Sequence, residues 1–178
     1  AHRDCSPQGH RVDAVDVNGD GRPDIQHVYD GSRQICELVD MNYDGRTDIN
    51  RFFGDDGTTV VQEEHDLDFD GRIDQVSYYE NGHLAKKELD TNFDNVIDTW
   101  IWCEGTHIAR SERDRHHTGR PDTWEQYANG QVTQIGYDDD NDHHPEKWEV
   151  FTNGVLTQMQ YDTNGDGRPD RNEAVPEE

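Results

Sequence analysis

The sequence predicts an all-β fold, an elongated antiparallel β-hairpin repeat arranged as a meander or as a solenoid-like stack. Three observations support this prediction. A nine-residue acidic motif recurs along the chain, a tight-turn signal lies midway between successive copies, and the intervening segments are rich in β-branched and aromatic residues. Only about 15 residues, with a Gly near their middle, separate one motif from the next, which leaves little room for helices. Each repeat therefore reads as strand, turn, strand and acidic loop.

The acidic motif sets the domain organisation. Its first copy runs from Asp16 to Asp24 and carries Asp or Asn at positions 1, 3, 5 and 9. The chain holds seven copies in all, spaced at intervals of 24, 26, 24, 24, 24 and 24 residues, and they begin at Asp16, Asp40, Asp66, Asp90, Asp114, Asp138 and Asp162. We expect residues 16–170 to form seven tandem repeats. Residues 1–15 would be a partial N-terminal hairpin unit, and residues 171–178 a C-terminal tail.

Each of the first six repeats carries a dipeptide that is typical of a tight turn between two strands. Asn-Gly and Asp-Gly favour such turns because both central residues need positive φ. The dipeptides are Asp30-Gly31, Asp56-Gly57, Asn81-Gly82, Glu104-Gly105, Asn129-Gly130 and Asn153-Gly154. Gln8-Gly9 marks the earlier partial unit. The two-residue insertion in the second repeat falls near Gly54–Gly57, where a turn tolerates extra residues.

Four oxygen-bearing side chains at alternating positions of a short loop suit a hard divalent cation. Calcium takes about 6–8 oxygen ligands and tolerates irregular geometry, so carboxylates, Asn carbonyls, one backbone carbonyl and water can complete its shell. Magnesium fits less well, because it prefers a tight octahedron that retains water. Position 6 needs a sharp turn, which Gly supplies in five copies and Asn95 and His143 supply in the other two. The sequence therefore predicts calcium loops that staple the hairpins together.

Six of the seven loops keep a full set of ligands, with side chains from positions 1, 3, 5 and 9 and a backbone carbonyl from position 7. In chain order, the predicted ligands are Asp16, Asn18, Asp20, Arg22, Asp24, Asp40, Asn42, Asp44, Arg46, Asp48, Asp66, Asp68, Asp70, Arg72, Asp74, Asp90, Asn92, Asp94, Val96, Asp98, Asp138, Asp140, Asp142, His144, Glu146, Asp162, Asn164, Asp166, Arg168 and Asp170. The loop that begins at Asp114 has His116 and Thr118 at positions 3 and 5, so we expect it to be weak or empty. Calcium at six sites would add twelve positive charges and bring the net charge from −24 to −12.

Two other interpretations of the loops have to be weighed. Asp, Asn and Gly also form simple Asx turns, but seven copies that preserve the ligand positions favour metal binding. A helical EF-hand or dockerin would need flanking helices and an acidic residue at position 12. Position 12 is His27, Arg51, Ser77, Ile101, Glu125, Glu149 and Glu173, so the early copies lack that ligand.

The loops resemble the D-x-[DN]-x-D-G-x-x-D calcium loops of thrombospondin type 3 repeats and of integrin-type β-propeller repeats. The hairpins resemble MORN-like or YwqK-like units, as in the segment from Tyr78 to Leu84. The loop resemblance covers six of the seven repeats, and it implies an extracellular, calcium-stapled β repeat. The spacing departs from both families, because thrombospondin repeats carry regular Cys residues and propeller blades are longer.

Composition limits the classes of function. The chain has 40 Asp and Glu residues against 16 Lys and Arg residues, and only 30% of its residues are hydrophobic. That leaves little apolar surface for an ordinary two-layer core, and the negative charge argues against nucleic-acid binding. No apolar run approaches the roughly 18 residues of a membrane span. The sequence contains no nucleophile elbow, phosphate-binding Gly loop or zinc-protease helix, so we do not expect an enzyme.

The cysteines and histidines leave alternatives open. Cys5 and Cys36 lie in neighbouring repeats and could form one disulfide that leaves Cys103 free, or all three could be small buried residues. His116-His117 and His143-His144 lie in the two irregular loops, where they could bind a transition metal or simply be solvated.

Aromatic residues recur in two columns. Trp100, Trp124 and Trp148 each lie two residues after position 9 and share one face. The second column lies on the opposite face by strand alternation and comprises Tyr29, Phe53, Tyr79, Cys103, Tyr127 and Phe151. Both columns could be packing ladders between neighbouring hairpins. The Trp column could also be a platform for sugars or a partner protein.

We expect a secreted or surface-exposed calcium-binding repeat protein that acts as a structural spacer, an adhesin segment or a partner-binding module. Extracellular modules bind calcium at about 10⁻⁴–10⁻³ M, an affinity that is useful where calcium is millimolar. One alternative is a carbohydrate-binding surface on the Trp column. Another is a calcium-regulated assembly factor that self-associates. The protein or carbohydrate partner at the cell surface is not identified by the sequence.

Overall fold

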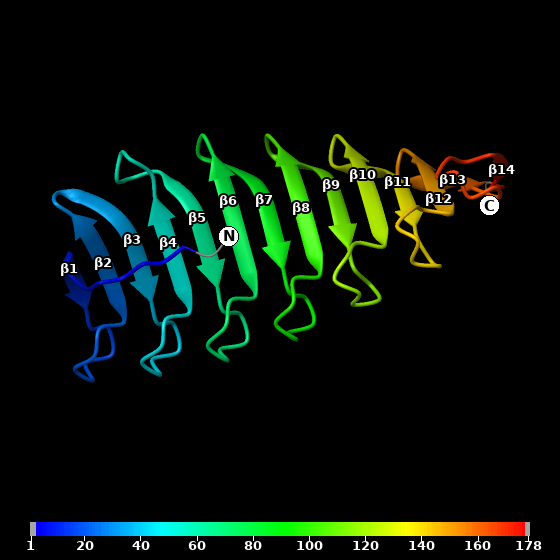
Figure 1. The fold of residues 1–178 in the computed structure, drawn as a ribbon. Coiled ribbons are helices and arrows are strands. Elements are labelled where there is room, and N and C mark those ends of the chain that lie inside the picture. The colour runs from blue at the N-terminus through cyan, green and yellow to red at the C-terminus, as the bar shows by residue number, and fades with distance from the viewer. Residues whose placement is uncertain (1–2, 177–178) are drawn as a thin grey trace. The chain divides into compact units, whose positions relative to one another are not determined.

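A computed structural model describes residues 3–176, and its regular elements are strands joined by turns and loops (Figure 1). No helix within those residues is long and apolar enough to cross a membrane. The chain divides into two compact units with a boundary between Asn95 and Val96. The first unit contains β1 (Arg11–Val15), β2 (Ile25–Asp30), β3 (Arg33–Val39), β4 (Ile49–Phe53), β5 (Val60–His65), β6 (Gln75–Glu80) and β7 (His83–Leu89). The second contains β8 (Thr99–Glu104), β9 (His107–Arg113), β10 (Thr123–Ala128), β11 (Gln131–Tyr137), β12 (Lys147–Thr152), β13 (Val155–Tyr161) and β14 (Arg171–Ala174).

In each unit every strand pairs antiparallel with the next strand along the chain. The predicted all-β hairpin meander is therefore confirmed within each unit. The C-terminal segment differs from the expected tail, because Arg171–Ala174 forms β14 against β13. At the N-terminus β1 pairs with β2, whereas residues 3–7 form no strand. Residues 1–2 and 177–178, which belong to those two expected segments, lie outside the described part of the chain.

The hairpin turns fall into two kinds. Asn81-Gly82, Asn129-Gly130 and Asn153-Gly154 are central turn pairs in which both residues have positive φ, as predicted. In the turns after Asp30 and Glu104 the central pair is shifted by one residue, and only its first residue, Gly31 or Gly105, has positive φ. A Gly at the first central position is typical of a type II′ turn, so the preceding acidic residue ends the strand instead. The insertion near Gly54–Gly57 lengthens the β4–β5 connection to residues 54–59.

A segment at the N-terminus covers one face of the first unit. Residues 3–10, which we call the N-terminal strap, run back across the neighbouring strands (Figure 1). Cys5 forms a disulfide with Cys36, and it packs against a small core made of Val28, Cys36 and Phe52. The backbone N–H of Arg3 donates to Glu64 at 3.1 Å. One of the two alternatives for the cysteines is thus confirmed, with Cys103 free and partly buried.

The opposite face of the first unit carries a ladder of charged side chains. The register places His27, Glu37, Arg51 and Glu63 side by side on β2 to β5. His27 Nδ1 lies 3.0 Å from Glu37, and Arg51 forms ion pairs with both Glu37 and Glu63, the second at 2.6 Å. Ion pairs therefore link neighbouring strands from β2 to β5 across this face of the sheet.

In the second unit a row of Trp side chains follows the register. Trp100 and Trp124 both pair with Glu112, and Trp124 and Trp148 both pair with Gly136. Trp148 is only 8% exposed, while Trp100 and Trp124 are partly buried. The row contributes packing between hairpins, which leaves Trp148 with little surface for a ligand.

Candidate metal centres

The acidic loops share one backbone scaffold that is held by the carboxylate at position 1. In the first loop the N–H groups of Gly19 and Gly21 donate to the two oxygens of Asp16 at 2.7 and 2.9 Å. The same pair of bonds recurs on Asp40, Asp66, Asp138 and Asp162. Short polar side chains compete well for nearby backbone N–H groups, so the loop closes around its first residue.

The side chains at positions 3 and 5 accept backbone N–H groups that hold the loop. The N–H of Asp20 donates to Asn18 Oδ1 at 2.8 Å, and the N–H of Arg22 donates to Asp20 Oδ1 at 2.8 Å. The second and seventh loops repeat these bonds. An Asn carbonyl oxygen has two lone pairs and a carboxylate has about four acceptor sites, so these side chains retain the capacity to bind a cation.

The carboxylate at position 9 is the most buried part of each early loop. Asp24, Asp48 and Asp74 are 1–3% exposed. In the first loop Asp24 Oδ2 accepts the N–H groups of Val17 and Asn18 at 2.6 and 3.1 Å. The N–H of Asp40, which opens the next loop, donates to the carbonyl oxygen of Asp24 at 2.7 Å. Buried charges need a partner, and each of these loops buries one at position 9.

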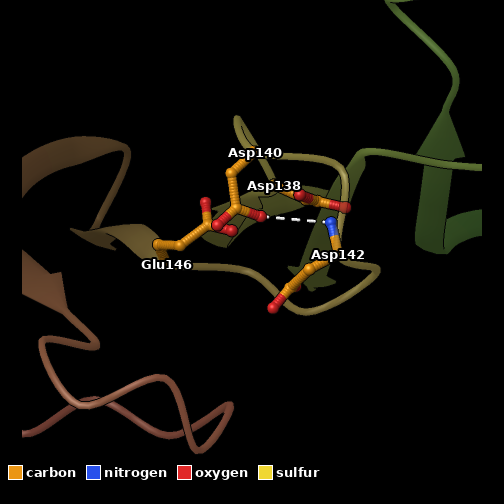
Figure 2. A group of neighbouring side chains, drawn as sticks. All are labelled: Asp138, Asp140, Asp142 and Glu146. Carbon is orange, nitrogen blue, oxygen red and sulfur yellow. Dashed lines mark hydrogen bonds between the residues drawn. The ribbon is translucent and has the colours of Figure 1, made fainter.

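Two loops bring their acidic side chains together within the first and second units. One oxygen from each of Asp66, Asp68 and Asp74 lies within 4.8 Å of the others. In the sixth loop the same holds for Asp138, Asp140, Asp142 and Glu146, which converge in Figure 2. The dashed line in Figure 2 joins the N–H of Asp142 to Asp140 Oδ1 at 3.1 Å. Such oxygen clusters match the ligand preference of calcium.

The sixth loop contains a buried oxygen that lacks a hydrogen-bond partner. Glu146 Oε2 accepts the N–H of Asp139 at 2.9 Å, whereas Glu146 Oε1 is buried and accepts no hydrogen bond from residues 3–176. An unsatisfied buried carboxylate oxygen is costly. A cation among the four carboxylates would satisfy it, so the residues present fit calcium.

The protonation of these carboxylates reflects their burial. Burial raises the pKa of Asp74, and the nearby charges of Asp68 and Asp66 add to the rise. Burial also raises the pKa of Glu146, with a further contribution from Asp140. Both groups are thus disfavoured as anions when no cation is present.

The remaining predicted sites are less compact. Among the described residues, the acidic side chains of the first, second and seventh loops form no such group of three. The fourth loop crosses the boundary between the two units, with Asp90, Asn92 and Asp94 on one side and Val96 and Asp98 on the other. Within the first unit, Asp90 accepts the N–H of Asn95 at 2.6 Å, the bond that position 1 makes to position 6 elsewhere.

One feature of the loops was not predicted. Position 4 has positive φ in every loop, as position 6 does, and it is occupied by Gly19, Tyr43, Phe69, Phe93, His117, Asn141 and Gly165. Tyr43, Phe69 and Phe93 are 44–47% exposed. An aromatic residue with left-handed backbone is uncommon, and a pattern based on ligand types gives no signal for it.

The histidine pairs lie in the fifth and sixth loops, and two of their rings contact charged side chains. His116 Nδ1 lies 2.7 Å from Asp122, and His143 Nε2 lies 2.8 Å from Arg120 Nη1. Among residues 3–176 no group of three potential His, Cys, Asp or Glu ligands contains a histidine. The alternative of a transition-metal site at these pairs therefore gains no support.

Comparisons with known proteins identify no family. No family model matches the chain, and no curated protein matches it in sequence. Among solved structures, it is similar to a chain in the crystal structure of accessory secretory protein 1, 2 and 3 in Streptococcus pneumoniae, with a TM-score of 0.40 and 13% sequence identity. That match covers 58% of this chain and 19% of the other. A likeness of this size carries no argument about function.

Proposed function

We propose that this protein is a calcium-binding β-hairpin repeat in which the ions take the place of a large apolar core. The observation that carries the proposal is the sixth loop, where four carboxylates converge around an unsatisfied buried oxygen of Glu146. The third loop supports it with three converging carboxylates. Only six hydrophobic residues are buried among the described residues, against seventeen buried polar or charged ones, so another source of stability is needed.

Calcium should act as a structural ligand that lowers the repulsion between carboxylates. The ligands must be deprotonated to bind, so the free energy of binding adds to that of folding. We expect about six ions per chain, with the fifth loop weak or empty. A spacer, an adhesin segment or a partner-binding module at the cell surface fits these properties. The Cys5–Cys36 disulfide supports an oxidising, extracellular compartment.

The proposal is tested by isothermal titration calorimetry of the chelator-treated protein with calcium chloride, alongside circular dichroism. We expect several ions to bind and the melting temperature to rise with calcium. Glu146→Gln should remove one ion, whereas Glu104→Gln, in an exposed hairpin position, should remove none. A chelated protein that is fully folded and takes up no calcium would refute the function.

A second candidate function is binding of a neutral carbohydrate. Trp100 and Trp124 are partly exposed and flank Glu112 on one face of the second unit. Aromatic rings with polar neighbours suit sugar rings, and Trp148 would contribute little because of its burial. Trp124→Ala should abolish retention on a glycan array and leave the calcium titration unchanged.

A further inference from the structure

The fifth loop lacks two of the usual acidic or Asn ligands but has the same backbone bonds as the other loops. It runs from Asp114 to Asp122 and has no acidic residue at positions 3 and 5. Asp114 still accepts the N–H of Gly119 at 2.7 Å, and the N–H of Asp122 still donates to the carbonyl of Arg113 at 2.8 Å. Asp122 is 1% exposed. This loop therefore buries a position 9 carboxylate although the oxygen cluster around it is gone.

A guanidinium and an imidazole contact that carboxylate, in addition to a backbone N–H group and a hydroxyl. Asp74 in the third loop is bound by backbone alone, through the N–H groups of Leu67 at 2.7 Å and Asp68 at 3.3 Å. Asp122 likewise accepts a backbone N–H, that of His116 at 2.9 Å, but it also accepts from Arg115 Nε at 3.0 Å and lies 2.7 Å from His116 Nδ1. Arg115 and His116 stand at positions 2 and 3, and Arg115 Nε also donates to Thr123 Oγ1 at 2.6 Å. A guanidinium thus lies against the buried oxygens of this loop.

We propose that Arg115, positioned together with His116, replaces calcium in the fifth loop and makes this repeat independent of the ion. The part of this proposal that says the other loops bind calcium rests on the proposed function. The contacts of Arg115 with Asp122 are independent of it. Arg115 and His116 are then the residues that prevent the fifth loop from binding calcium.

The formal charges of the loops agree with this assignment. The third loop has four carboxylates and one guanidinium, a charge of −3 before any ion binds. The fifth has two carboxylates and two guanidiniums and is neutral when its histidines are neutral. Arg115 Nη2 also reaches Asp139 in the sixth loop at 3.2 Å. The Arg115 guanidinium therefore compensates negative charge in two successive loops of the second unit.

The pKa shifts of Asp74 and Asp122 have opposite directions, as this assignment predicts. Burial raises the pKa of Asp74, with the charges of Asp68 and Asp66. Burial alone would raise the pKa of Asp122 as well, but hydrogen bonds from Thr123, from backbone N–H groups and from Arg115 lower it. Asp122 is therefore stabilised as an anion without a metal.

The first test uses the intact chain in chelator. All four Trp residues lie between positions 100 and 148, so Trp fluorescence reports unfolding of the second unit. Arg115→Gln should lower the melting temperature in chelator by about 5–10 °C, because it leaves a buried carboxylate without its cation. Arg120→Gln is the matched control, since it removes the same charge from the same loop but not from Asp122. Equal shifts for the two variants would overturn the proposal, whether or not any loop binds calcium.

The second test rebuilds the loop. The triple variant Arg115→Thr, His116→Asn, Thr118→Asp restores the motif, and calorimetry should show one more calcium ion than in the unaltered chain. If the unaltered chain binds calcium and the triple variant binds no additional ion, the assignment is contradicted. If neither protein binds calcium, the proposed function has failed, and the comparison of Arg115→Gln with Arg120→Gln still decides the role of Arg115.

Discussion

A β carbon placed on Gly136 would lie 3.1 Å from both Cδ1 and Nε1 of the Trp148 indole. The two residues are cross-strand partners on β11 and β12. Trp148 is buried because the missing side chain of Gly136 leaves room for its ring. Gly136 is thus required for packing, and its φ lies outside the positive range.

Gly136→Ala should destabilise the second unit, although Gly→Ala in a strand usually stabilises. The added methyl forces the indole to shift, which should cost about 1–3 kcal/mol. Denaturant unfolding followed by Trp fluorescence measures this loss. In a Trp148→Leu background the same substitution should cost much less, and an equal cost in both backgrounds would show that the ring is not involved.

Phe69→Asn should stabilise the first unit despite the loss of an aromatic ring. Phe69 has φ 65 and is 44% exposed, so it carries left-handed strain and gains little from burial. Asn tolerates this backbone, and we expect a gain of about 1 kcal/mol. Leu67→Asn, in the same loop at 46% exposure and without positive φ, is the control. A gain in both variants would point to surface polarity as the cause rather than backbone strain.

Cys5→Ser should weaken the first unit by about 3–4 kcal/mol, because the disulfide closes a loop with a sequence separation of 31 residues. Denaturant unfolding followed by circular dichroism checks this. Cys103→Ser changes a free thiol and should have a small effect. A thiol reductant should reproduce the loss in the unaltered chain and leave Cys5→Ser unchanged.

The charged ladder predicts a loss of stability in acid. Burial would raise the pKa of Glu63, but hydrogen bonding and charge from Arg51, with help from His65, lower it below 4.5. A carboxylate with a depressed pKa contributes stability above its unfolded pKa, and this contribution disappears as the pH falls through the folded value. Urea midpoints of the unaltered chain and Glu63→Gln, measured with calcium present, should differ at pH 6, and the difference should shrink as the pH is lowered toward 3. A constant difference across that range would contradict the role of the ion pair.

The periodic part of the fold could be predicted from sequence because each repeat contains the local signals for its own strands, turn and loop. Acidic loops, turn dipeptides and β-prone segments all recur at the same spacing, and the hairpin meander follows from local preferences alone. The turn pairs at Asn81, Asn129 and Asn153 were predicted correctly for this reason. The turns after Asp30 and Glu104 shift by one residue because Gly can also occupy the first central position.

What could not be predicted depends on contacts across the sheet. The N-terminal strap has no strand pattern, and its place follows from the pairing of Cys5 with Cys36. Arg115 lies at position 2, which the loop motif leaves unspecified, and only the fold brings its guanidinium to Asp122. The left-handed backbone at Tyr43 and Phe69 is imposed by the bonds that close each loop on its first carboxylate.

The disulfide also decides how the chain bears tension. A pull on the N-terminus passes through Cys5 directly into Cys36 on β3, because the covalent bridge is shorter than the path through the intervening chain. Residues 6–35, which include β1, β2 and the first acidic loop, are bypassed. The force therefore acts first on the pairing between β3 and β4. A spacer anchored by its N-terminus would therefore keep its first repeat relaxed while the repeats beyond it are stretched.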